Sequence, residues 1–151
     1  MAIGQSRLHE LLKRRRLISN AVFWVTTFES QVTRNTIIDW IREDQLRGKG
    51  INADGQEIGF YSYATELITN GEKQEGDPYT LNDTGEFYRS MYMTVLTDAI
   101  QFNANPIKGN DNLFAKYGEN ILNLTDENLL KLKQLVKRKY IEQLRKILFG
   151  T

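Results

Sequence analysis

The acidic and basic side chains of one polar stretch are of the types that metal-assisted chemistry uses. Glu75 and Asp77 stand close to Lys73, and a metal-dependent nuclease brings two or three carboxylates, often with a lysine, into one pocket. The sequence offers no strand pattern that would place these three side chains together. We therefore interpret them as solvated or interface charges.

Other kinds of catalytic chemistry are limited by the residue types that the chain lacks. It contains no cysteine and a single histidine, His9, which excludes disulfides, thiol catalysis, Cys-type zinc sites and multi-histidine metal sites built from one chain. A His-based triad is not expected either. The sequence predicts no enzyme activity and no cofactor, and the absence of cysteine suits a reducing cytoplasm.

The length and composition indicate one domain with a real core. The chain has 151 residues, of which 40% are hydrophobic and 11% aromatic, and domains most often run to about 100–150 residues. No window approaches the roughly 18 apolar residues of a membrane span, so no membrane contact is expected. Polar residues interrupt the stretch 17–28 and no small-residue cleavage site follows it, which argues against a signal peptide.

The net charge of +1 hides an uneven distribution of charge along the chain. Residues 1–16 carry five bases and one acid, residues 43–86 ten acids and three bases, and residues 131–146 seven bases and one acid. Such asymmetry favours pairing within one fold or between neighbouring copies. The bases are candidates for contacts with neighbours or with DNA phosphates, or they solvate the outer faces of helices. The candidates are Lys13, Arg14, Arg15, Arg16, Lys133 and Lys137.

Hydrophobic periodicity predicts helices at both ends of the chain. Residues 6–17 are typical of a short helix. A longer helix is predicted over 20–47, where a gap in the apolar period near Asn35 is compatible with a bend. Thr125, which two acids follow, is predicted to cap a long C-terminal helix that continues to Phe149.

Between these helices, a turn-rich segment precedes a β-hairpin. Glycine and asparagine turn signals predict an extended loop or arm that reaches a neighbour. Residues 91–107 alternate apolar and polar side chains, as two paired strands do, and residues 112–117 are expected to form a short helix. The overall prediction is an α+β fold in a single domain, 1–151. Its parts are N-terminal helices (1–47), the arm (48–80), a central antiparallel β-hairpin or small sheet (81–107) and a helical part (112–149) with the long C-terminal helix.

Aromatic residues gather in the middle third of the chain. Tyrosine combines a large apolar area with a hydroxyl, which suits interfaces, so the region is a candidate contact surface. An aromatic-lined core explains the same pattern equally well. The contact candidates are Tyr61, Tyr63 and Tyr79, and the candidates for anchoring the hairpin are Leu81, Phe87 and Tyr88.

The segment 81–90, Leu-Asn-Asp-Thr-Gly-Glu-Phe-Tyr-Arg-Ser, resembles a segment of tailed-bacteriophage neck and tail-completion proteins. Their pattern is leucine, any residue, aspartate-threonine-glycine, any residue, leucine or phenylalanine, two residues of any type, and serine. The side chains of Asp83 and Thr84 are expected to cap backbone donors, and Gly85 permits a tight turn. The motif anchors are Leu81, Asp83, Thr84, Gly85, Phe87 and Ser90.

A second segment, 117–128, is similar to the same family where its terminal helix begins. The family pattern there runs from a glycine to phenylalanine-leucine-glycine-leucine-threonine and two acids. Asn123 stands where glycine is commoner, and the usual arginine–proline pair upstream is missing. Together the two segments extend the resemblance over roughly residues 80–148, about the last half of the chain.

The resemblance implies a structural virion protein, a ring-forming head–tail connector or tail-completion subunit that joins the portal or adaptor to the tail around the DNA channel. The implied partners are further copies in a homo-oligomeric ring of six or twelve, the portal or adaptor and tail proteins, and packaged DNA through non-specific contacts. The implied location is the neck or tail of the virion, assembled in the host cytoplasm.

Two alternatives remain beside this interpretation. One is a small DNA-binding protein that uses the basic N-terminal helix. The other is a hydrolase dependent on Asp83, because retroviral-type aspartic proteases also contain an Asp-Thr-Gly triplet. Those proteases need an apolar strand before the triplet, whereas residues 76–80 are polar here. The hydrolase therefore ranks third.

Overall fold

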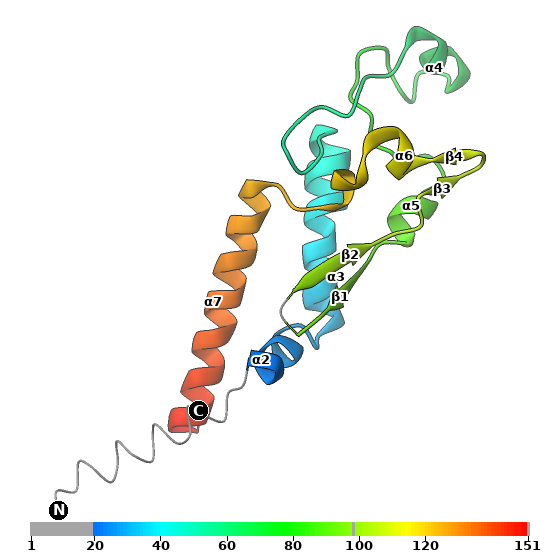
Figure 1. Cartoon of the computed structure of the whole chain (residues 1–151). Coiled ribbons are helices and arrows are strands. Elements are labelled where there is room, and N and C mark those ends of the chain that lie inside the picture. The colour runs from blue at the N-terminus through cyan, green and yellow to red at the C-terminus, as the bar shows by residue number, and fades with distance from the viewer. Residues whose placement is uncertain (1–19, 98, 151) are drawn as a thin grey trace, which may run out of the picture.

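The computed structural model describes residues 20–97 and 99–150, and it confirms the predicted α+β fold (Figure 1). The predicted helix over 6–17 and the basic run Lys13–Arg16 lie outside the described residues. Within the described ranges, none of the helices combines the length and the apolar content that crossing a bilayer requires. The elements are α2 (Asn20–Thr27), α3 (Gln31–Asp39), the π-helix η1 (Trp40–Arg47), α4 (Tyr63–Ile68), α5 (Glu86–Arg89), β1 (Tyr92–Val95), β2 (Ile100–Asn103), β3 (Ile107–Lys108), β4 (Asp111–Asn112), α6 (Leu113–Tyr117), the 3-10 helix η2 (Glu119–Leu122) and α7 (Asp126–Phe149).

The prediction of one helix over 20–47 is wrong. The helix is interrupted after Thr27, and Ser30, in extended backbone with φ −68° and ψ 122°, precedes α3. Asn35, where the gap in the period lay, sits inside α3 instead. The break lets α2 contact α7 while α3 packs against β1, which one straight rod could not do. Ser30, a residue type preferred at helix starts, was the available signal.

A buried polar network fixes the start of α7 against η1. The Gln45 side chain, 1% exposed, donates from Nε2 to the Asn123 carbonyl at 2.8 Å and accepts at Oε1 from the Thr125 N–H at 2.9 Å. Asn128 Nδ2 donates to the same Oε1 at 2.8 Å and to the Trp40 carbonyl at 3.1 Å. Thr125 caps α7 as predicted, because its hydroxyl accepts from the Asn128 N–H.

The core lies where α3 and η1 meet the first hairpin and the 113–124 segment. Met93 pairs with Phe102 across the antiparallel β1–β2 ladder, and the predicted alternation holds, since Met91 and Met93 are buried and Tyr92 is exposed. The buried apolar residues of this core are Phe28, Ile37, Ile38, Ile41, Leu46, Phe87, Tyr88, Met91, Met93, Leu113, Ile121, Leu122 and Leu124.

A second hairpin, β3–β4, was not predicted from the sequence. Ile107 pairs with Asn112 and Lys108 with Asp111, around Gly109 at φ +58°. The dipeptide Gly109-Asn110 was the signal, since such pairs populate tight two-residue turns. The hairpin leads directly into α6, which Asn112 caps and Gly118 ends, so the predicted helix over 112–117 is present with a start one residue later.

Candidate interaction surfaces

Of the predicted arm 48–80, residues 59–80 form a projecting segment, whereas Ile51 and Ala53 are hydrogen-bonded to the body through Gln45 and Asn120. From here on, the arm means residues 59–80. Its two sides pair through the backbone: the Tyr61 N–H donates to the Asp77 carbonyl at 2.9 Å, and the Tyr79 N–H donates to the Gly59 carbonyl at 2.7 Å. The rings of Tyr61 and Tyr79 meet edge to face, with centroids 4.9 Å apart. These contacts order the two paired sides of the arm, which we call the stem. Helix α4 lies at the outer end of the arm (Figure 1).

The outer end of the arm is apolar and faces solvent. Ser62 caps α4 by accepting from the Thr65 N–H, and the Gly71 N–H closes the helix by donating to the Glu66 carbonyl at 2.9 Å. The predicted extended arm thus contains a short helix over Tyr63–Ile68. Its apolar side chains remain uncovered: Tyr63 is 57% exposed, Leu67 60% and Ile68 81%. We call these three residues the arm tip.

Asp83 connects the arm to the body of the molecule. Its carboxylate lies 3.3 Å from Lys73 Nζ in the arm and 3.0 Å from Lys108 Nζ in β3. The hydrogen bond from Lys108, then that from Lys73, holds the pKa of this carboxyl below its usual value. The expectation that Asp83 caps backbone donors is therefore corrected, because two lysine ammonium groups take its oxygens.

The contacts of the other residues in the 81–90 motif agree with the predicted turn. The Thr84 hydroxyl accepts from the Glu86 N–H at 3.4 Å, and Gly85 adopts a left-handed φ of +76° immediately before α5. Phe87 is buried in the core, and the Ser90 hydroxyl accepts from the Asn105 N–H at 2.9 Å, which ties the end of α5 to the segment after β2. Leu81 packs partly buried against the core at φ +54°. The triplet thus makes a turn that positions α5.

Three carboxylates of α3 and η1 form ion pairs within the described chain. Asp39 pairs with Arg42, Glu43 pairs with Arg47 at 2.7 Å, and Asp44 pairs with Lys131 of α7 at 3.0 Å. Within residues 20–97 and 99–150, no three acidic or histidine side chains gather closely enough to hold a metal ion. An aspartic dyad needs two carboxylates that share one proton, whereas the side-chain partners of Asp83 in the described chain are cations. These acids therefore have structural partners.

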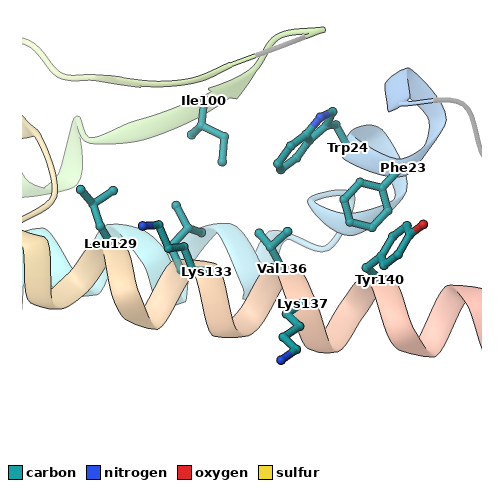
Figure 2. A pocket seen from close by; sticks show the side chains of 9 residues that line it. Phe23, Trp24, Ile100, Leu129, Lys133, Val136, Lys137 and Tyr140 are labelled. Atoms are coloured by element: carbon teal, nitrogen blue, oxygen red, sulfur yellow. The ribbon is translucent and has the colours of Figure 1, made fainter.

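A groove of about 710 Å³ is lined by side chains of α7, α2 and β2. Figure 2 shows Trp24 and Phe23 at one end, Ile100 above, and Leu129 and Val136 rising from α7. The rings of Phe23 and Tyr140 meet edge to face at 5.2 Å and close that end. The lining residues are Phe23, Trp24, Ile100, Leu129, Leu132, Lys133, Val136, Lys137 and Tyr140.

The two lysines of this lining carry unpaired positive charge. The ion pairs that α7 makes within the described chain use Glu127, Lys131, Lys139 and Glu142, and none includes Lys133 or Lys137. Figure 2 shows Lys137 extending away from Trp24 and Ile100, toward the outer side of α7. The groove is thus lined mainly by apolar side chains, and two lysine side chains lie along the edge that α7 forms.

The other described residues cover the long helix α7 only in part. Of its 24 residues, only Asn128 is buried. Leu132 and Val136 pack partly buried against the core, whereas Leu129 is 39% exposed and Leu130 58%. An amphipathic helix in a compact domain normally buries an apolar stripe about 100° wide, so α7 leaves apolar area that residues 20–97 and 99–150 do not cover.

The structure separates the aromatic candidates into two groups. Tyr63 lies at the exposed arm tip and Tyr61 and Tyr79 in the stem, whereas Phe87 and Tyr88 belong to the core. The aromatic-lined core is therefore confirmed for Phe87 and Tyr88, whereas the contact surface stays a prediction for the three tyrosines of the arm. Lys133 and Lys137 line the groove.

Four residues of the arm tip and the groove were not singled out from the sequence. Leu67 and Ile68 lie within the predicted arm, and Phe23 and Trp24 lie within the helix predicted over 20–47. The signal for the first pair was their position between turn residues, with Ser62 before them and Asn70-Gly71 after them. Sequence alone does not reveal that the arm carries them away from the core.

No family model, no curated protein and no solved structure shows significant similarity to the chain. The arm tip and the groove are therefore the features of this structure that bear on its function.

Proposed function

We propose that this chain is a ring-forming subunit of a tailed-phage head–tail connector or tail-completion assembly. It would join the portal or adaptor to the tail around the DNA channel, and it would act through surfaces rather than through catalysis. The observation that carries the proposal is the poor coverage of α7, a 24-residue helix with a single buried residue. The apolar area of α7 that the described residues leave exposed favours cover by further protein.

Two separate surfaces favour a ring over a twofold dimer. The arm tip and the groove are both apolar, yet they lie on different parts of the molecule and are built from different elements. When unlike surfaces of identical copies meet, each copy still offers one free surface of each kind, and the assembly grows until it closes. A closed ring leaves neither surface exposed to solvent.

The placement in a phage neck rests on the family resemblance. The Asp-Thr-Gly turn precedes α5 and the hairpin β1–β2, and the second segment leads through η2 into the capped start of α7. The resemblance thus spans the elements that frame the groove on two sides. It assigns the neighbours, namely the portal or adaptor and the tail proteins.

The test is reconstitution with the portal protein encoded by the same genome. We expect electron microscopy of the mixed proteins to show a ring of this chain, of order six or twelve, seated coaxially on the portal. Failure to associate with the portal, adaptor or tail proteins of that genome would contradict the proposal. Tight binding to duplex DNA, with affinity that falls steeply as salt rises, would favour the small DNA-binding alternative instead.

A further inference from the structure

We infer that the arm tip of one copy inserts into the groove of a neighbouring copy. This inference rests on the proposed function in one respect, because both require that copies of the chain associate. It adds which residues of two neighbouring copies are in contact. The arm tip is Tyr63, Leu67 and Ile68, and the groove lies between α7, α2 and β2. The occupant of the groove is thus a second copy of this chain.

The apolar character and the size of the two surfaces match. An apolar cavity of about 150 Å³ accommodates one benzene molecule, and the groove, at about 710 Å³, has room for several side chains of that size. The arm tip presents three large apolar side chains within six residues of one short helix. Tyr63 and Leu67 are four residues apart on one face of α4, a spacing that helix-in-groove recognition uses.

The charges of the two surfaces are opposite. Residues 59–80 contain four acids and one lysine, and that lysine, Lys73, already pairs with Asp83. In the described part of the chain, no base lies within ion-pair distance of Glu72 or Glu75. Lys133 and Lys137 at the groove are likewise unpaired there. Acids around an apolar tip and lysines around an apolar groove would steer two copies into one orientation.

The position of the arm prevents the contact from forming within one copy. Figure 1 shows α4 at one end of the molecule and α2, which supplies Phe23 and Trp24 to the groove, at the opposite end. The backbone pairing of the stem and the Asp83 ion pairs hold the arm in its projecting direction. The arm tip therefore reaches a groove only on another molecule.

The first experiment changes the arm tip without disturbing the fold. Ile68 is 81% exposed at the last position of α4, so Ile68→Lys should fold normally. It places a cation against the lysines of the groove, and we expect the self-association constant in sedimentation velocity to fall at least tenfold. The matched control is Val32→Lys, because Val32 is 75% exposed on α3 and lies outside both surfaces. Equal association of the two variants and the unaltered chain would overturn the inference.

The second experiment identifies the contact directly and exploits the absence of cysteine from the chain. Chains with Ile68→Cys are mixed with size-tagged chains that carry Leu129→Cys in the groove, and a short bismaleimide joins cysteines that lie close together. We expect a strong mixed product. Leu130→Cys is the control, since Leu130 is more exposed than Leu129 but does not line the groove, and it should give little product.

The outcomes separate this inference from the proposed function. Rings on the portal without the Ile68–Leu129 product would overturn the arm contact and leave the connector proposal standing. The mixed product without any ring on the portal would support the arm contact and contradict the connector. A Leu129→Cys chain that links to Leu11→Cys in preference to Ile68→Cys would overturn the inference in favour of the N-terminal segment as the occupant.

Discussion

Gln45 holds the beginning of the long C-terminal helix in place. Its amide satisfies the Asn123 carbonyl, the Thr125 N–H and the Asn128 side chain inside the protein. Replacement by leucine leaves buried polar groups without partners, and each such group costs about 1–3 kcal/mol. We expect Gln45→Leu to lower the free energy of unfolding in urea by about 3 kcal/mol. The control is Gln134→Leu at an exposed position of α7, and an equal effect of the two changes would contradict the role of the network.

Tyr88 should give the protein a distinct alkaline stability profile. Burial raises the pKa of its phenol above the usual value, and the hydroxyl donates to the Thr80 carbonyl. A group whose pKa is higher in the folded state stabilises the fold below its unfolded pKa, near 10, and that stabilisation is lost as pH rises further. We expect the unfolding free energy to fall between pH 10 and 12 more steeply for the unaltered protein than for Tyr88→Phe.

The control for this measurement is Tyr92→Phe, because the Tyr92 side chain is exposed on β1. Its pH profile should follow that of the unaltered protein. At neutral pH, Tyr88→Phe should cost about 1 kcal/mol through the lost hydrogen bond. Identical alkaline slopes for the unaltered protein and Tyr88→Phe would show that Tyr88 does not control the profile.

At the scale of elements, the arm depends on one carboxylate for its attachment to the hairpin β3–β4. Asp83 bridges Lys73 and Lys108, but it is half exposed, so the pairs contribute only about 0.5 kcal/mol to global stability. Their effect should be local. We expect Asp83→Asn to speed amide hydrogen exchange in residues 59–80 several-fold, with little change in the unfolding midpoint.

Acid should have the same local effect as that substitution. The pKa of Asp83 is lowered in the folded state, so its ion pairs stabilise the arm above the unfolded value of 3.8 and are lost as pH falls below it. Asp111→Asn is the matched control, because Asp111 lies on the neighbouring strand β4 and makes no ion pair within the described residues. Exchange in the arm that is indifferent to Asp83→Asn would contradict this attachment.

The elements that the sequence predicted well are those whose pattern is local. Alternation from Met91 to Val95 fixes the face of β1, and Thr125 with two acids fixes the start of α7. The break at Ser30 was not predicted, because the helical periodicity on its two sides is nearly continuous. Only the packing of α2 on α7 and of α3 on β1 selects the bend.

The sequence predicted some residues of the candidate surfaces and not others, because residue type and charge are local but burial is not. Tyr63, Lys133 and Lys137 were chosen from residue type and charge, and they lie at the arm tip and the groove. Isoleucine and tryptophan are residue types that often lie in the core, so Ile68 and Trp24 did not stand out in the sequence. Whether such side chains are covered is decided by contacts between distant segments, which no local pattern records.

At the scale of the whole molecule, the uncovered surfaces link stability to concentration. A chain of this length should bury roughly two-thirds of the surface that it exposes when unfolded. Here the apolar area of α7, the groove and the arm tip stays in contact with water in a single copy. Assembly would remove that area from water, so part of the stability of this fold is expected to come from its neighbours.

The melting temperature should therefore rise with protein concentration. Association with a native partner at a hundred times its dissociation constant stabilises the native state by about 2.7 kcal/mol. For a chain of this size, that corresponds to a shift of about 5–10 °C. We expect differential scanning fluorimetry to show this shift over a hundredfold range of concentration for the unaltered protein and for Val32→Lys. Ile68→Lys should show a clearly smaller shift, because association that is at least tenfold weaker removes about 1.4 kcal/mol of this stabilisation. The melting temperature of the unaltered chain could instead be independent of concentration. One copy would then be as stable as the assembly, and that result would contradict the view that neighbouring copies cover the exposed face of α7.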